Sequence, residues 1–153
     1  MFTEQEVTQA QADWGNGIVK IGSLKNDRAA CVEATLAHLD NLYAFDLGPV
    51  LFKPTKAADV QFRLSKESAI SYFIGGDENF PEDNGFAIHP YTAVRFENAG
   101  MILEAQRAIA MGNYYFTDLD GNDTKVEYTF GYKKDANGNL RIDLHHSSIP
   151  FAK

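Results

Sequence analysis

Cysteine is almost absent from this sequence. Cys31 is the single cysteine among 153 residues, so the chain can form no internal disulfide, and a metal site built on several thiolates is excluded. Cys31 lies in an apolar stretch, and we interpret it as a buried, unreactive thiol. The four histidines lack metal-binding spacings such as His-x-x-x-His. We therefore expect neither a metal nor another cofactor.

Positive charge is also scarce. The chain has 14 Lys and Arg against 21 Asp and Glu, which gives a net charge of −7. Binding to nucleic acid needs a cluster of basic residues, so we expect no nucleic-acid partner. The longest apolar runs fall far short of the ~20 residues needed to cross a bilayer, and no basic-then-apolar leader opens the chain. We therefore expect a cytoplasmic protein without membrane contact.

The patterns that are present divide the chain into a helical half and a strand half. Thr3 and Glu6 form a capping box, and an apolar stripe that includes Trp14 follows at helical spacing. Further helices are predicted near 28–39 and 66–74. From residue 86 onward, turn sequences at 97–100, 118–123 and 135–139 separate four strands. Helices followed by antiparallel strands predict an α+β fold.

The turns also predict which side chains of the sheet share a face. Two-residue loops at 98–99, 120–121 and 137–138 would pair Gly112 with Thr129 and Thr129 with His146. One face would then carry a mixture of polar and small residues, whereas the other is aromatic and needs a cover. Successive strand residues point to opposite faces, so a register shift of one residue would exchange the places of His145 and His146.

Several sequence motifs occur in a fixed order along the chain. They are a Trp-containing first helix, Leu42–Ala44, Val50–Thr55, a helix ending in Tyr72-Phe73, Gly112–Phe116, Val126–Phe130 and His145–Pro150. This order resembles the nuclear transport factor 2-like superfamily, also called SnoaL-like or ketosteroid-isomerase-like. Within it, the chain is similar to small bacterial proteins grouped with the association domain of calcium/calmodulin-dependent protein kinase II.

The resemblance implies a single domain over residues 1–153. Its fold would be a cone-shaped α+β barrel, with a curved antiparallel sheet wrapped around the N-terminal helix. It also implies a homodimer formed through the sheet. The kinase association domains carry an arginine near the position of Thr129, which this chain lacks, and the acid/base pair of the steroid isomerases has no equivalent here. The chemistry of those proteins is therefore not carried over.

A pocket between the first helix and the sheet is the expected functional site. His146 is a candidate catalytic residue, because histidine changes charge near neutral pH. Glu104 is a second candidate, because shielding by the helices would raise the pKa of its carboxyl group. The residues expected to line the pocket are Trp14, His89, Tyr91, Gln106, Tyr114, Thr129 and Ser148. Structural alternatives remain: a hydrogen bond from His146 to Thr129 and Ser148, and an ion pair of Glu104 with Arg95.

Three functions are compatible with such a pocket. The leading hypothesis is a dimeric binding protein for a small, partly polar organic ligand. The second is an isomerase, cyclase or hydratase that uses His146 for proton transfer. The third is an association module without chemistry. A shared fold does not decide among them.

Overall fold

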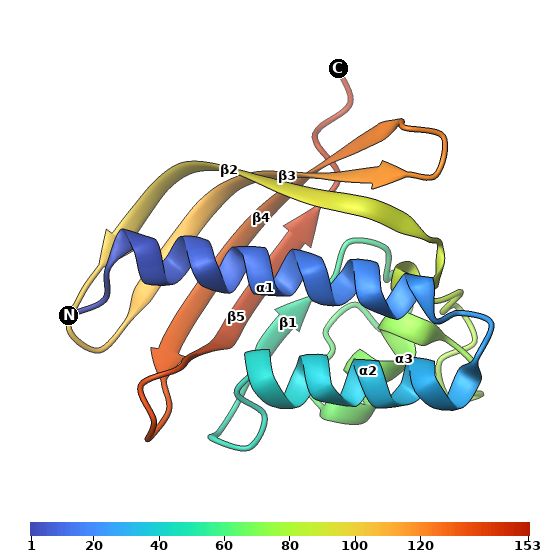
Figure 1. Cartoon of the computed structure of the whole chain (residues 1–153), viewed down its shortest axis with the longest axis horizontal. Coiled ribbons are helices and arrows are strands. Elements are labelled where there is room, and N and C mark those ends of the chain that lie inside the picture. The colour runs from blue at the N-terminus through green and yellow to red at the C-terminus, as the bar shows by residue number, and fades with distance from the viewer.

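The computed structural model describes all residues from Met1 to Lys153, which form helices packed against one sheet (Figure 1). In chain order the elements are α1 (Glu4–Ser23), α2 (Arg28–Leu42), β1 (Leu51–Lys53), α3 (Lys66–Ile74), the short 3₁₀ helix η1 (Phe86–Ile88), β2 (Tyr91–Leu103), β3 (Ala108–Asp118), β4 (Asp123–Lys134) and β5 (Leu140–Ser148). The α+β prediction is confirmed. None of these helices is long and apolar enough to cross a membrane.

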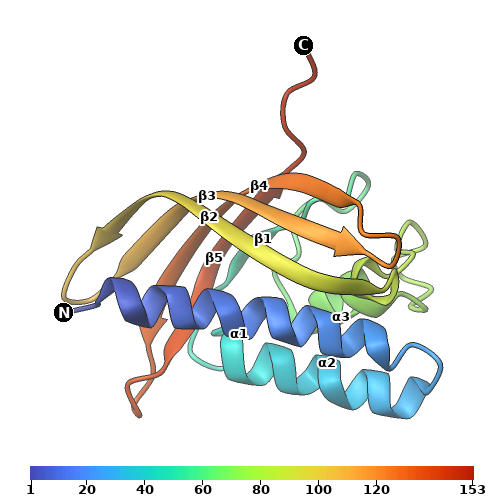
Figure 2. The same ribbon diagram turned by 45° about the horizontal axis from the view of Figure 1, so that its top comes forward.

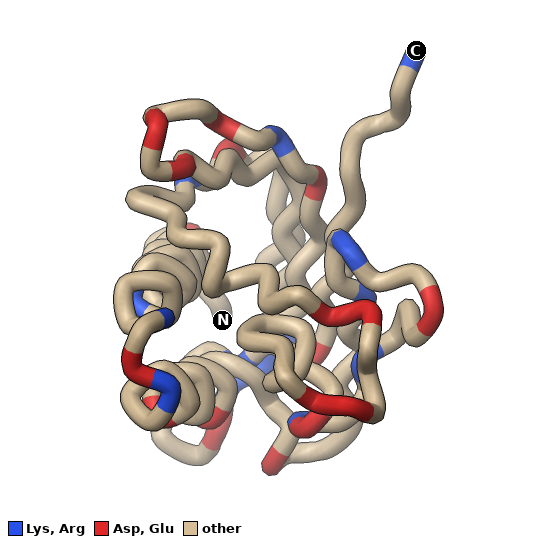
Figure 3. The backbone as a smooth tube through the Cα atoms, turned by 90° about the vertical axis from the view of Figure 1, so that its right-hand side faces the viewer, with Lys and Arg blue, Asp and Glu red and all other residues tan.

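The expected cone-shaped α+β fold with a curved sheet is confirmed, and the sheet is open and has one parallel strand pair besides the antiparallel ones. Its strand order is β1-β5-β4-β3-β2. β1 runs parallel to β5, and the other neighbouring strands are antiparallel. Figure 2 shows the sheet curving over α1, with α2 lying beside α1 on the side away from the strands. In Figure 3 the C-terminal segment extends away from the sheet, and acidic positions are distributed among several loops and turns.

α1 forms where the sequence predicts it. The Thr3 hydroxyl accepts a hydrogen bond from the Glu6 backbone N–H at 3.1 Å, and the Glu6 carboxylate accepts one from the Thr3 backbone N–H at 2.9 Å. This capping box satisfies two N–H groups that a helix start leaves free. The buried stripe of the helix consists of Val7, Gln11, Trp14, Ile18 and Ile21. It packs under a sheet face rich in buried aromatic rings, so α1 and the sheet enclose the core.

The hairpin predicted at residues 97–100 is wrong. β2 continues to Leu103, and the chain turns between Glu104 and Arg107, where the Glu104 backbone N–H bonds the Arg107 carbonyl at 2.9 Å. The segment from Asn98 to Gly100 is a β-bulge instead. Asn and Gly favour bulges as well as turns. The Asn98 side chain also exchanges amide hydrogen bonds with Gln11 of α1.

The turns after β3 and β4 lie at the predicted positions but are longer than predicted. Residues 118–122 form the first turn, so Gly112 pairs with Tyr128 rather than with Thr129. The second turn, 135–139, is also longer, and a bulge at Gly131–Tyr132 compensates for it. The predicted pair of Thr129 with His146 therefore forms, although the face assignment fails.

The register shift exchanges the two adjacent histidines of β5. His145 is 2% exposed and faces the helices, whereas His146 is exposed on the outer face. Tyr114, expected on the same face as His146, lies on the inner face with His145. A one-residue shift has this effect because side chains alternate along a strand.

Candidate active site

A chain of hydrogen bonds begins at α1 and runs through buried side chains to β5. The Trp14 Nε1–H donates to Tyr43 Oη at 3.0 Å. Tyr43 Oη lies 2.7 Å from Nδ1 of His145, and Tyr114 Oη lies 3.1 Å from Nε2 of the same ring. All four side chains are almost fully buried. The imidazole is therefore held at both ring nitrogens.

The chain of hydrogen bonds continues through hydroxyl groups. Tyr114 Oη lies 2.6 Å from Ser147 Oγ, which lies 2.6 Å from Thr55 Oγ1. His145 and Ser147 are two residues apart on β5 and so point to the same face. Lys53 pairs with His146 in the parallel β1–β5 ladder, so the residues that follow Lys53 lie beside the last residues of β5. This pairing brings the Thr55 hydroxyl next to that of Ser147.

A small cavity of about 10 Å³ lies at the end of this chain. Its polar lining consists of Thr55, Tyr72, Tyr114, His145 and Ser147, and its apolar lining of Trp14, Phe52, Pro54, Phe73 and Phe86. A volume of this size is close to that of a single water molecule. The cavity is thus a small, mainly aromatic space in which several hydroxyl groups converge.

The polar groups around the cavity are uncharged. Burial lowers the pKa of His145 well below its usual value of 6.5, so the ring is neutral at neutral pH. Burial also raises the pKa of Tyr72 and Tyr114 far above their usual value of 10. The cavity therefore presents hydrogen-bond donors and acceptors without a fixed charge.

The hydrogen bonds have a preferred direction. Trp14 can only donate, so Tyr43 accepts from it. If Tyr43 then donates its one proton to Nδ1 of His145, the imidazole proton sits on Nε2 and is donated to Tyr114. Tyr114 in turn donates to Ser147, and Ser147 donates to Thr55. This assignment gives every donor along the chain an acceptor and leaves the Thr55 hydroxyl proton for the cavity.

Tyr72 supplies a second donor to the cavity. Its Oη accepts a hydrogen bond from the Lys56 backbone N–H at 3.1 Å, which leaves its own proton available. Tyr72 and Phe86 also line a neighbouring cavity of about 130 Å³, which we call the vestibule. The other residues that line the vestibule are Lys56, Glu82, Asp83, Asn84, Gly85 and His89. The two cavities therefore meet at Tyr72 and Phe86.

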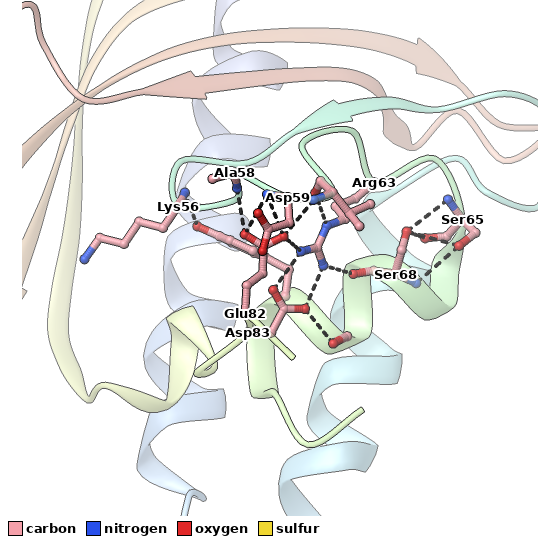
Figure 4. Close-up of polar contacts among 11 residues, drawn as sticks. Lys56, Ala58, Asp59, Arg63, Ser65, Ser68, Glu82 and Asp83 are labelled. Carbon is pink, nitrogen blue, oxygen red and sulfur yellow. Dashed lines mark hydrogen bonds and ion pairs between the residues drawn. The ribbon is translucent and has the colours of Figure 1, made fainter. Parts of the chain in front are cut away.

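A buried ion pair fixes the segment that carries Thr55 (Figure 4). The Arg63 guanidinium is fully buried and bonds both carboxylate oxygens of Asp83 at 2.7 Å. It also donates to the carbonyl oxygens of Val60 and Ser68. Such a bidentate pair fixes geometry as well as charge. It anchors residues 54–64 against α3 and against the loop that follows α3.

Glu82 adds a second connection between the same two segments. Its carboxylate accepts hydrogen bonds from the backbone N–H groups of Ala58, Asp59 and Val60, at 2.7–3.2 Å. These bonds lower the pKa of the Glu82 carboxyl group. We call the contacts of Arg63, Glu82 and Asp83 the latch. The latch holds Thr55 and the Lys56 N–H in place beside Tyr72.

Four of the residues predicted to line the pocket lie near these cavities. Trp14 and Tyr114 meet at the inner cavity, with ring centroids 5.5 Å apart. His89 lines the vestibule and is otherwise exposed. Tyr91 is half-buried against Phe86, with ring centroids 5.5 Å apart.

The structure separates the other predicted residues from the inner cavity. His146, Thr129 and Ser148 line a groove of about 370 Å³ on the outer face of the sheet. Glu104 and Gln106 are exposed in the β2–β3 turn. The expected placement of these five side chains in one pocket is therefore wrong, because the register and the first hairpin differ from the prediction. Likewise, Arg95 pairs with Glu97 at 2.7 Å and not with Glu104.

The residues missed from the sequence are hydroxyl-bearing or aromatic and come from separate segments. They are Tyr43, Thr55, Tyr72, His145 and Ser147. His145 and Ser147 are two residues apart on one strand and therefore share a face, which the sequence does show. Only the correct register tells which face of the sheet that is. No group of three or more His, Cys, Asp or Glu side chains is arranged to hold a metal ion.

The fold defines a class of protein. Over 97% of its length the chain resembles a nuclear transport factor 2-like superfamily protein from Salmonella enterica serovar Typhimurium, of which it covers 92%, with a TM-score of 0.54 and 14% identity. It also resembles a Xanthomonas campestris protein provisionally named a calcium/calmodulin dependent protein kinase II association domain. There the TM-score is 0.62 at 24% identity, covering 98% and 89% of the two chains. These similarities show the nuclear transport factor 2-like fold.

Sequence comparisons assign the chain to one family within this fold. Residues 5–149 match the family model described as "Metal-independent carbonic anhydrase". A protein of that name from Nostoc sp. (strain PCC 7120) is 40% identical, over 98% of this chain and 75% of the relative. The crystal structure of the iota-carbonic anhydrase from a cyanobacterium complexed with bicarbonate has a TM-score of 0.96 and 38% identity, covering 99% and 94% of the two chains. The chain therefore belongs to the metal-independent carbonic anhydrase family.

This membership corrects the leading functional hypothesis. The prediction of a binding protein for an organic ligand is wrong, because the relatives are named as enzymes, one of them complexed with bicarbonate. The predicted relation to kinase association domains holds at the level of the fold.

Proposed function

We propose that this protein catalyses the reversible hydration of carbon dioxide to bicarbonate in the cavity lined by Thr55, Tyr72 and Ser147. The observation that carries the proposal is the continuous chain of hydrogen bonds that starts at Trp14 and reaches the Thr55 hydroxyl at this cavity. The similarity to a carbonic anhydrase complexed with bicarbonate supports the choice of substrate.

The reaction places specific demands on the cavity. The oxygen of a water molecule attacks the carbon of carbon dioxide, and a C–O bond forms. One C=O bond becomes a C–O⁻ bond, and the water gives up a proton. Negative charge therefore develops on an oxygen that was uncharged in the substrate. Preorganised donors aimed at that oxygen stabilise the transition state more than the ground state.

The donors of Thr55 and Tyr72 meet this demand. Tyr72 accepts the Lys56 N–H, and in the direction assigned above Thr55 accepts the Ser147 hydroxyl, so both hydroxyl protons are available to the cavity. Bicarbonate itself has oxygen acceptors and one O–H donor, and hydroxyl groups can serve both. The surrounding aromatic rings exclude bulk water, which strengthens these hydrogen bonds. The cavity must widen to admit a substrate larger than water, and the segments around Tyr72 and Phe86 are the walls shared with the vestibule.

His145 acts in this scheme as a donor and not as the base. Its Nε2–H donates to the Tyr114 hydroxyl and polarises it. The polarised Tyr114 hydroxyl in turn polarises the Ser147 hydroxyl, which donates to Thr55. A ring whose burial opposes protonation is poorly suited to store the proton released by water. His145 and Tyr114 are thus positioning residues for the Thr55 donor.

Rates of carbon dioxide hydration, measured by stopped flow in the presence of a chelator, test the proposal. We expect an active wild-type protein and a loss of kcat of about 100-fold in Thr55→Val and in Ser147→Ala, the usual effect of removing one such donor. Ser148→Ala is the matched control, because that hydroxyl lies on the outer face, and it should retain wild-type activity. An inactive wild type, or equal rates for Ser147→Ala and Ser148→Ala, would refute the proposal.

We also propose that two copies associate through the outer face of the sheet. Ile102 and Met111 lie on that face and are 55% and 56% exposed. Contact with a second copy would remove this apolar surface from water, which is favourable. Sedimentation velocity should give a dimer for the wild type and a monomer for Met111→Glu. A monomeric wild type at micromolar concentration would contradict the proposal.

A further inference from the structure

The proposed reaction releases one proton for each carbon dioxide hydrated, and that proton must leave the inner cavity. In the direction assigned above, the chain of hydrogen bonds from Trp14 to Thr55 points its donors toward the cavity, and the oxygen of a neutral hydroxyl group is too weak a base to hold the released proton. The imidazole of His145 resists protonation because it is buried. The exit for the proton therefore lies on the other side of the cavity, where Tyr72 and Phe86 separate it from the vestibule.

The two carboxylates in the vestibule are already engaged in hydrogen bonds and an ion pair, so they are poorly suited to take up the proton. The carboxylate of Glu82 accepts three backbone N–H groups. The carboxylate of Asp83 is bonded by Arg63 and by the Ser71 hydroxyl. Protonation of either carboxylate would break the latch. Lys56 carries an ammonium group, which has donors and no acceptor.

Besides Tyr72, His89 is the remaining ionisable side chain that lines the vestibule. It follows η1 directly, so its position is fixed by the same short helix that places Phe86 at the boundary of the two cavities. Its side chain is exposed and can exchange protons with bulk water. Histidine is the side chain that gains and loses a proton between pH 5 and 8.

We propose that His89 carries the released proton from the vestibule to the solvent. This inference rests on the proposed hydration of carbon dioxide. Once the wall at Tyr72 and Phe86 has widened to admit the substrate, the attacking water gives its proton to a vestibule water as the C–O bond forms. In a separate, later step, the protonated vestibule water gives a proton to the imidazole of His89. The imidazolium then gives a proton to a buffer molecule in bulk solution. Atoms and charge balance, since one bicarbonate and one protonated buffer result from each carbon dioxide.

If His89 transfers the proton, its replacement should change kcat and kcat/KM differently. The interconversion of carbon dioxide and bicarbonate determines kcat/KM, whereas the later proton transfer limits kcat. In dilute buffer, His89→Ala should therefore lower kcat by at least about tenfold and leave kcat/KM unchanged. Added imidazole should restore kcat, because it can take the proton directly from the vestibule. His89→Gln, which keeps a polar side chain of similar size, should behave in the same way.

The matched control is His146→Ala, which removes an exposed histidine from the outer face of the sheet. We expect wild-type kcat in dilute buffer for this variant. Wild-type kcat for His89→Ala in dilute buffer, a parallel loss of kcat/KM, or a deficit that imidazole does not reduce would overturn the inference. If the wild type itself hydrates no carbon dioxide, the proposed function fails instead, and this is seen before any variant is compared.

Discussion

Replacing His38 with leucine should make the protein more resistant to acid. His38 lies in α2, is 5% exposed, and packs against the rings of Trp14, Tyr43 and Phe73 at centroid distances of 5.8–6.2 Å. Neither of its ring nitrogens has a hydrogen-bond partner. Burial lowers its pKa from 6.5 to about 3. The folded protein thus holds this histidine neutral at pH values where the unfolded chain protonates it.

The sign and size of the effect follow from proton linkage. Because the pKa is lower in the folded state, the unfolded state binds more protons below pH 6.5. Stability is therefore lost as the pH falls from about 6.5 toward the folded pKa. For a pKa that drops from 6.5 to about 3, the free energy of unfolding falls by about 2 kcal/mol between pH 7 and pH 5. His38→Leu removes this contribution and nearly matches the branching of the ring at Cγ.

Urea unfolding at pH 7 and pH 5 measures the effect. The comparison between the two pH values cancels any constant difference in packing between the variant and the wild type. We expect the wild type to lose about 2 kcal/mol more than His38→Leu between pH 7 and pH 5. His146→Leu, the same change at an exposed histidine, should keep the wild-type pH dependence. Identical losses for His38→Leu and the wild type would refute the reasoning.

Two further substitutions test the packing of α1 and the latch. A Cβ at Gly17 would lie 2.1 Å from His38 Nδ1. Gly17→Ala should therefore lower the free energy of unfolding, measured by urea titration, by roughly 1–3 kcal/mol. Gly100→Ala is the control and should have little effect, because a Cβ at Gly100 meets nothing within 4 Å. Glu82→Gln places an amide donor against backbone N–H donors and should lower kcat for carbon dioxide hydration with unchanged circular dichroism. Glu78→Gln, an exposed acid in the same loop, is its control, and equal kcat values for the two variants would contradict the role of the latch.

The sequence predicts the helices well because their signals are local. The capping box of Thr3 and Glu6 and the apolar stripe that contains Trp14 lie within one continuous segment, and both are confirmed. The α+β class and the positions of the last two turns follow from similarly local patterns. Such signals need no knowledge of which segments meet in three dimensions.

The sheet register required information that a single sequence does not contain. Turns of two and of five residues carry the same Asp-Gly or Asn-Gly sequence, and the bulge at Asn98–Gly100 resembles a turn. An error of one residue moves every later side chain to the opposite face. For this reason the prediction placed His146 under the helices where the structure places His145.

The site itself is assembled from distant segments. Tyr43 follows α2, Thr55 follows β1, and Tyr72 belongs to α3, yet all three approach β5. Hydroxyl groups are common in proteins and have no characteristic spacing when they come from different elements. The sequence therefore offered histidine and glutamate as candidates, although the cavity is built from hydroxyl groups around a neutral imidazole.

The central claim is that catalysis takes place on the inner face of β5. The most direct test is the ratio of the carbon dioxide hydration rates of His145→Phe and His146→Phe, the same change at adjacent residues that point in opposite directions. Phenylalanine at 145 keeps the stacking against Phe130, whose ring centroid is 4.1 Å away, but removes the Nε2–H donor. We predict that His145→Phe loses about 100-fold in kcat while His146→Phe retains the wild-type rate. Equal rates, or a larger loss in His146→Phe, would contradict the account.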